Sequence, residues 1–198
     1  MNQYQNAGVG LLKMYKAMIG MLISMVAALV FSCIPIVSVV CIIAIIVFTI
    51  QDWIGFYYVG KDIPLCKVGF FLQVISLAVS VVAMFIPQLS GISSATGILP
   101  LIAQLLLIVG VTKVLKEKGA TATAKWGKLT FWFIIATDVC MVFSPLSTIV
   151  LIFADAPLKV VTSIGTIFSL VLMVCSIAFL VFNLKFLKNG AEEFGSYV

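Results

Sequence analysis

The sequence predicts an all-α polytopic membrane protein, a bundle of six transmembrane helices that forms a single integral membrane domain over residues 1–198. Hydrophobic residues make up 63% of the chain and charged residues only 10%, whereas soluble domains average about 45–50% and about 25%. Six apolar runs are long enough to cross a bilayer, which takes about 20 helical residues. Finally, the lysines gather in the segments that separate these runs.

The six predicted spans follow one another with short connections. They cover residues 17–34, 36–59, 68–86, 98–114, 129–153 and 160–184. The first span follows Lys13 and Lys16 and is longer than the apolar region of a secretory signal peptide. Pro35 predicts a turn between the first two spans, because proline interrupts a helix. No stretch remains for a separate soluble domain.

Lysine placement predicts the orientation of the chain. All twelve basic residues are lysine. Eleven of them lie before the first span, between the second and third, in the basic loop 113–128, or after the sixth. Only Lys159 falls on the opposite side. Because positively charged loops stay in the cytoplasm, both termini are predicted to be cytoplasmic, and an even number of spans requires the same arrangement.

Proline positions suggest how the spans are related. The odd-numbered spans end near Pro35, Pro87 and Pro145, and each begins after a lysine, which fits three parallel repeats of a two-helix hairpin. Two alternatives stay open. Proline commonly ends helices in any case, and six spans can also form two inverted three-helix halves.

Small residues at four-residue spacing predict helix contact faces, because they let two helices approach closely. Three such stripes occur, in the first, third and sixth spans: Gly20, Ser24 and Ala28; Ser76 and Ser80; and Gly165 and Ser169.

The residue types that are missing exclude several classes of function. The chain has no His and no Arg, which removes Ser-His and Cys-His nucleophile pairs, His-containing metal sites and guanidinium clamps on phosphate. The five cysteines form no CxxC motif and are predicted to be small buried apolar residues. We therefore expect no enzyme, cofactor or metal site. No basic patch with interleaved aromatic residues indicates a nucleic-acid partner.

Asp138 is the leading candidate for a functional site. It lies about ten residues from each end of the predicted span 129–153, where a carboxylate costs about 2.5–3.5 kcal/mol to insert. Gln104 and Gln73 lie deep in their own predicted spans and, with the neighbouring Thr137, could hydrogen-bond the carboxyl group. Two interpretations stay open: a neutral packing residue, or a proton- or cation-binding site in a polar cavity.

Lys16 and Asp52 are predicted to form an interfacial ion pair. Lys16 lies nineteen residues before Pro35 and Asp52 seventeen residues after it, so the two share a similar depth in a tight hairpin. The alternative is an interfacial site for a lipid headgroup or an ion.

The strings Gly10-Leu11-Leu12-Lys13-Met14-Tyr15 and Gly127-Lys128-Leu129, before the first and fifth spans, resemble those of small six-pass membrane proteins of Gram-positive gut bacteria. That group carries no assigned function, so the resemblance implies a bacterial cytoplasmic membrane and no activity. The first expectation is an accessory or assembly subunit that works through a membrane partner or a second copy of itself. The alternative is a small transporter for a proton, a cation or a small apolar solute that uses Asp138.

Overall fold

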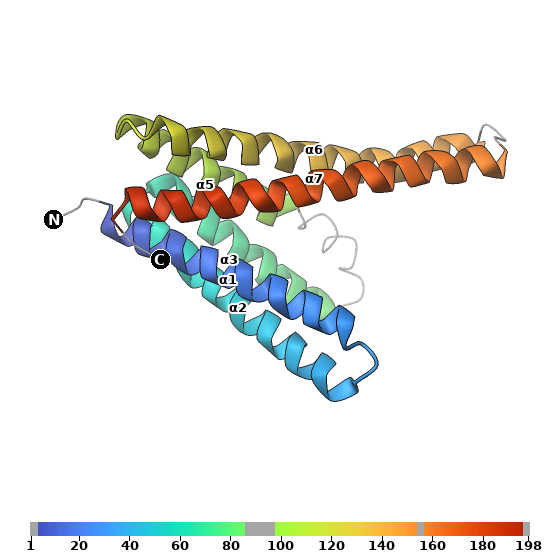
Figure 1. Ribbon diagram of the computed structural model, residues 1–198, viewed down its shortest axis with the longest axis horizontal. Helices are drawn as coiled ribbons and strands as arrows, with labels where there is room; N and C mark the ends of the chain where they lie inside the picture. Colours follow the sequence, from blue (N-terminus) through green and yellow to red (C-terminus); the bar gives the residue numbers. More distant parts are fainter. Residues whose placement is uncertain (1–3, 86–97, 154–156, 196–198) are drawn as a thin grey trace.

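The computed structural model describes residues 4–85, 98–153 and 157–195, and within these residues it is all-α (Figure 1). The six helices there are α1 (Gln5–Val30), α2 (Pro35–Asp62), α3 (Pro64–Phe85), α5 (Ile98–Glu117), α6 (Thr121–Phe153) and α7 (Leu158–Glu193). Five of them, α1, α2, α3, α5 and α7, are long and apolar enough to cross a membrane. The predicted span 129–153 lies in α6, which is not among the five when the described residues are considered.

Several helices extend past the predicted spans at their lysine-bearing ends. Helix α1 begins at Gln5 rather than at residue 17, and α7 continues to Glu193 rather than ending at residue 184. Helix α6 begins at Thr121, so the predicted loop 113–128 is mostly helical and only residues 118–120 connect α5 to α6. Hydropathy marks only the apolar part of a helix, whereas the hydrogen bonds between backbone groups continue through charged residues.

Gly119 makes this short connection. Its φ of 80° lies in the left-handed region, which glycine adopts without a steric penalty. The Ala120 N–H donates to the Leu115 carbonyl at 2.9 Å, and the Gly119 N–H donates to the Lys116 carbonyl at 3.0 Å. This pattern satisfies the last carbonyls of α5 in the manner of a Schellman motif, so α6 starts at once and packs against α5.

Neighbouring helices pack in three pairs: α1 with α2, α3 with α5, and α6 with α7. Both ends of the described chain and the α2–α3 and α5–α6 connections lie together at the left of Figure 1, and the α1–α2 turn lies at the far end. The rings of Tyr4 and Phe194 are 5.6 Å apart there, and Lys118 donates to the Glu193 carbonyl at 3.5 Å. The segments with eleven of the twelve lysines therefore share one end of the molecule, here called the lysine end.

The buried core also lies toward the lysine end. All six described helices contribute to it, and the side chains of Phe56, Phe186 and Phe194 are completely buried. Toward the other end, the α1–α2 and α6–α7 pairs diverge (Figure 1), and Leu29 and Ile36 are 77% and 76% exposed. Apolar surface of this extent requires a cover, which a lipid bilayer supplies.

Helices α1 and α2 are in backbone contact where Gly10 faces Gly55. A Cβ atom on Gly10 would lie 2.5 Å from the Gly55 carbonyl oxygen, and a Cβ atom on Gly55 would lie 2.7 Å from the Gly10 carbonyl oxygen. Of the predicted stripes, the one on α1 is a contact face, since Gly20 lies against the Phe48 ring. For the stripe on α7, no described atom lies within 4 Å of a Cβ atom built on Gly165, so its role as a contact face stays a prediction.

The prolines do not mark equivalent positions in the helix pairs. Pro35 begins α2, in the first turn where proline is tolerated. Pro145 lies inside α6, which continues to Phe153, the predicted end of the fifth span, so this proline does not end its helix. Pro87 lies outside the described residues. Pro35 and Pro145 thus occupy different positions in their helix pairs, and these two prolines do not support a hairpin repeat.

We predict that Gly55→Ala destabilises the protein by about 1–3 kcal/mol, because the new methyl group would meet the backbone of α1. The matched control is Gly165→Ala on α7, where a methyl group meets no described atom and helix propensity favours alanine by about 1 kcal/mol. Thermal unfolding in detergent, followed by circular dichroism, measures both. Equal midpoints for the two variants would contradict the close contact.

Candidate functional site

A small polar cavity lies where α1, α2, α5 and α7 meet. Its volume is about 70 Å³. The residues that line it are Met14, Met18, Met21, Asp52, Gln104, Leu107, Ile108, Asn183 and Leu187. The polar members Asp52, Gln104 and Asn183 come from three different helices. A water molecule needs about 10–15 Å³ of such space, so the cavity has room for a water molecule or a small ion beside the carboxyl group.

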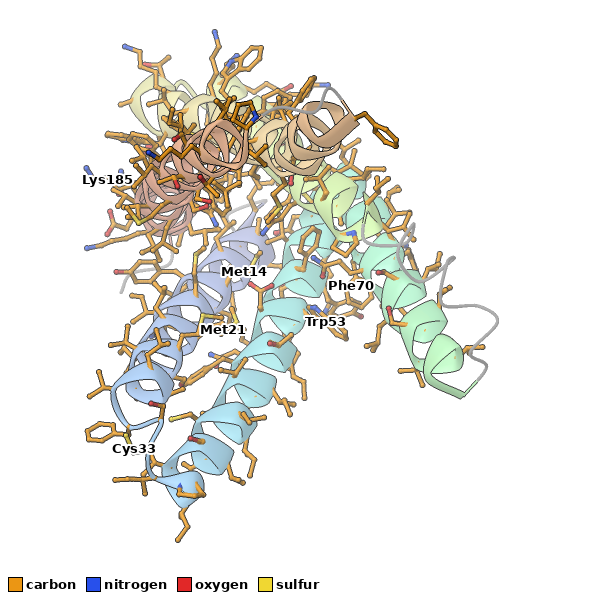
Figure 2. The ribbon with its side chains drawn as sticks, turned by 90° about the vertical axis from the view of Figure 1, so that its right-hand side faces the viewer. Met14, Met21, Cys33, Trp53, Phe70 and Lys185 are labelled. Atoms are coloured by element: carbon orange, nitrogen blue, oxygen red, sulfur yellow. The ribbon has the colours of Figure 1, made fainter. Side chains whose placement is uncertain are left out.

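Three methionines form the α1 wall of this cavity. Met14, Met18 and Met21 share one face of α1, because residues four and seven positions apart are neighbours on a helix surface. Figure 2 shows Met14 and Met21 between α1 and α2. The Asn183 Nδ2 group donates to Met18 Sδ at 3.4 Å, and the Thr49 hydroxyl group lies 3.7 Å from Met21 Sδ. These contacts hold the wall against α7 and α2.

Asp52 reaches the cavity because of the α1–α2 crossing. It lies three residues before Gly55, on the side of α2 that faces α1. It is also ten residues from Asp62, the last residue of α2, a distance of about 15 Å along the helix. A carboxylate at that depth needs a partner or a function. The described lining offers it the amides of Gln104 and Asn183 and no lysine.

Lys16, the predicted partner of Asp52, lies on another face of α1. It is two residues from Met14, which places it about 200° around the helix axis from the methionine wall. Its side chain is exposed and does not line the cavity. The cavity therefore gives Asp52 a set of neighbours that does not include Lys16.

The residues predicted to surround Asp138 lie in several places. Gln104 lines the Asp52 cavity, and the Thr137 hydroxyl group donates to the Phe133 carbonyl of its own helix at 2.8 Å. Gln73 is buried on α3, and its Oε1 atom has no hydrogen-bond partner among the described residues. Asp138 is half-buried on α6 and does not line the Asp52 cavity. Whether it is a packing residue or a site stays open.

Sequence reasoning missed Asn183 and the methionine wall. Asn183 lies one residue before the end of the predicted span 160–184, where a polar residue attracts no notice. The spacing of Met14, Met18 and Met21 was visible, but a methionine stripe is more often part of a core than of a site. Only the packing of α7 against α1 brings the two together.

The chemistry of the cavity favours a small, singly charged cation. Across residues 4–85, 98–153 and 157–195, no three His, Cys, Asp or Glu side chains are grouped so that they could hold a metal ion. One carboxylate with two amides offers oxygen donors suited to a hard cation, but too few for the six to eight that calcium takes. A proton, or a small monovalent cation that keeps water in its shell, matches this set.

The five cysteines, all within the described residues, are free. Cys41 and Cys66 are buried, as predicted. Cys33 is exposed at the α1–α2 turn (Figure 2), so the prediction of burial is wrong for this residue. The apolar run that contains Cys33 ends in a turn rather than inside a helix contact.

Comparison of the chain with models of known protein families, with curated proteins and with solved structures finds no match. The function therefore has to be argued from the arrangement of its own residues.

We predict that Lys16 and Asp52 are energetically independent. In a double-mutant cycle with Lys16→Met and Asp52→Asn, the coupling between the two changes should stay below about 0.5 kcal/mol, the limit for sites that share no contact. Reversible unfolding in mixed micelles gives the four free energies.

The matched cycle pairs Lys13→Met with Tyr58→Leu, since Lys13 Nζ lies 4.3 Å from the centroid of the Tyr58 ring. This contact should give a coupling of about 0.5–1 kcal/mol. A larger coupling for Lys16 and Asp52 than for this pair would restore the predicted ion pair.

Proposed function

We propose that this protein is a small, non-enzymatic transporter of the cytoplasmic membrane, which binds a proton or a monovalent cation at Asp52. The proposal includes six spans and cytoplasmic termini. The observation that carries it is the meeting of Asp52, Gln104 and Asn183, from three helices, at one cavity of about 70 Å³. The site thus moves from Asp138, which the sequence ranks first, to Asp52.

Charge placement supports the proposed orientation. At the lysine end, Lys61 lies in the last turn of α2 and Lys118 in the α5–α6 connection, and both described ends of the chain lie beside them. Their charges stack on aromatic rings: Lys61 Nζ lies 4.7 Å from the Tyr58 ring centroid, and Lys118 Nζ lies 4.8 Å from that of Phe194. Lysine and aromatic residues together are typical of a membrane–water interface, and the lysine bias favours the cytoplasmic one.

Exchange at one carboxyl group supplies the proposed mechanism. A protonated Asp52 is neutral and suits the apolar surroundings of the cavity. When a cation enters, the carboxyl group releases its proton and the carboxylate binds the cation, so the charge at the site stays the same. The amide oxygens of Gln104 and Asn183, together with water in the cavity, would complete the coordination of the cation. Proton and cation then compete for one site, which is the requirement for their exchange across a membrane.

The test of transport uses Asp52→Asn in sealed proteoliposomes that hold a pH-sensitive dye. With a sodium or potassium gradient imposed, we expect the wild-type protein to move protons in the opposite direction, and Asp52→Asn to lower the rate about tenfold or more, since the asparagine cannot ionise. The matched control is Asp138→Asn, which should keep the wild-type rate. Wild-type exchange by Asp52→Asn would refute the proposal.

A labelling experiment tests binding without transport. Dicyclohexylcarbodiimide modifies protonated carboxyl groups in apolar surroundings, and peptide mass spectrometry locates the adduct. We expect an adduct on Asp52 whose yield falls as sodium or potassium is added, because the bound cation displaces the proton. Yields that do not respond to either ion would exclude a cation site at Asp52.

A partner-dependent role is the second candidate, and the apolar surface of α7 favours it. In the most apolar 18-residue stretch of the span Lys159–Glu193, no residue is buried by other described parts of the chain. Val174 and Ile177 there are 61% and 55% exposed. Lipid or a second copy could cover this face. Crosslinking through Cys175 on α7, with the other cysteines replaced by alanine, tests for a second copy. Crosslinked dimers in native membranes, together with wild-type exchange by Asp52→Asn, would favour this candidate.

A further inference from the structure

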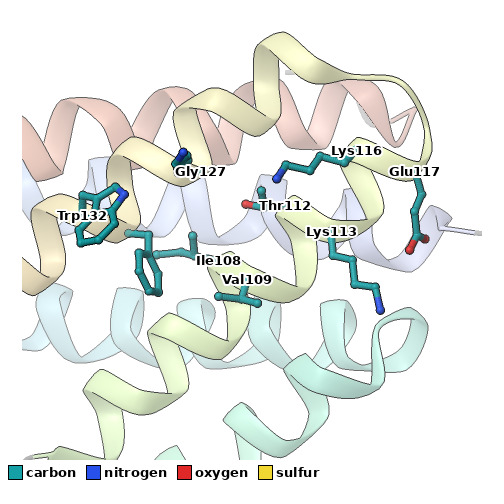
Figure 3. Close-up of a pocket in the computed structure, with 10 residues that line it drawn as sticks. Ile108, Val109, Thr112, Lys113, Lys116, Glu117, Gly127 and Trp132 are labelled. Atoms are coloured by element: carbon teal, nitrogen blue, oxygen red, sulfur yellow. The ribbon is translucent and has the colours of Figure 1, made fainter.

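A large pocket opens between α5 and α6 near the lysine end (Figure 3). Its volume is about 560 Å³, within the range of about 300–1,000 Å³ that small-molecule sites occupy. Its lining has a basic rim (Lys113, Lys116 and Lys128), an apolar wall (Ile108, Val109, Phe131 and Trp132), and the residues Thr112, Glu117 and Gly127.

The pocket changes from charged to apolar along the helix axis. Lys116 on the basic rim is eight residues from Ile108 on the apolar wall, which corresponds to about 12 Å along α5. In Figure 3 the Lys116 side chain extends toward Thr112 and Gly127. On the apolar wall, Trp132 is 57% exposed and Val109 is 44% exposed. A phospholipid has the same order of groups, with a charged phosphate followed by an apolar hydrocarbon chain.

The lining also contains a buried hydroxyl group, that of Thr112. Thr112 is 9% exposed, and its Oγ1 atom has no hydrogen-bond partner among the described residues. A Cβ atom on Gly127 would collide with this hydroxyl group and with the Phe186 ring, so glycine lets α6 approach α5 here. An unpartnered buried hydroxyl group is costly. Threonine uses two rotamers in a helix, so this hydroxyl group can turn either toward a carbonyl oxygen of α5 or toward a ligand oxygen in the pocket.

We propose that this pocket binds one anionic phospholipid, with its phosphate at the basic rim and one acyl chain along the apolar wall. The described lining contains three lysines and one acidic residue, Glu117, so its net charge is positive. Lysine binds phosphate as a point charge. Basic pockets between membrane helices on the cytoplasmic side hold anionic headgroups in this way. This inference does not depend on Asp52, which lines the other cavity.

The test uses Trp132 as the reporter. Trp53→Phe and Trp126→Phe leave it as the single tryptophan, and circular dichroism confirms that the variant is folded. The protein is placed in phosphatidylcholine nanodiscs, and dibrominated phosphatidylglycerol or dibrominated phosphatidylcholine is added as a quencher. We expect phosphatidylglycerol to quench at about tenfold lower mole fraction, and this preference to fall roughly fivefold, to about twofold, in each of the single variants Lys116→Gln and Lys128→Gln.

The matched control is Lys125→Gln, because Lys125 is exposed on α6, the helix that carries Lys128, and does not line the pocket. It should keep the preference for phosphatidylglycerol. Equal quenching by both lipids, or an equal loss in Lys125→Gln, would overturn the proposal. Release of phosphatidylglycerol by excess inorganic phosphate would identify a soluble phosphate ligand and also overturn it. Native mass spectrometry of Lys116→Gln alone, titrated with both lipids, gives a second readout of the same preference.

Discussion

The backbone contact between Gly10 and Gly55 fixes where the polar groups of this protein meet. Because α1 and α2 touch there, Asp52, one turn earlier on α2, faces the methionine wall of α1. The α1 helix also packs on α7, which brings Asn183 to the same wall through its contact with Met18. Asp62 strengthens the arrangement, since its Oδ2 atom accepts the Ala7 N–H at 2.7 Å and so satisfies a free donor in the first turn of α1.

The helices were largely predictable, and so were some of their ends, since α5 begins at Ile98 and α6 ends at Phe153 as predicted; their lysine-bearing ends were not. Apolar runs predict helices because a chain in lipid must satisfy its backbone hydrogen bonds internally. A span predicted from hydropathy stops at charged residues, whereas the helix continues through them. Helices α1 and α7 therefore extend about ten residues beyond the predicted spans. The connection at Gly119 needed knowledge of its positive φ, because the sequence around it, rich in alanine and threonine, reads equally well as a flexible linker or as the first turn of α6.

The site was harder to predict than the helices, because depth can be counted along a sequence and direction cannot. Asp138 ranked first on depth alone, and Lys16 was matched to Asp52 on depth alone. Whether two residues meet depends on the rotation of each helix, and two residues along α1 separate the exposed Lys16 from the buried Met14. Gln104 was identified because any amide deep in a span is expensive. Its neighbours became known only from the cavity, which residues of α1, α2, α5 and α7 line together.

Helix α5 links the two polar features of the molecule. Ile108 lines both the Asp52 cavity and the pocket between α5 and α6, and Gln104 lies one turn before it on the same helix. In lipid, helices gain no hydrophobic free energy from contact with one another, so their positions depend on close fit. A ligand that fills the pocket therefore bears on the position of α5, and α5 carries one of the two amides beside Asp52.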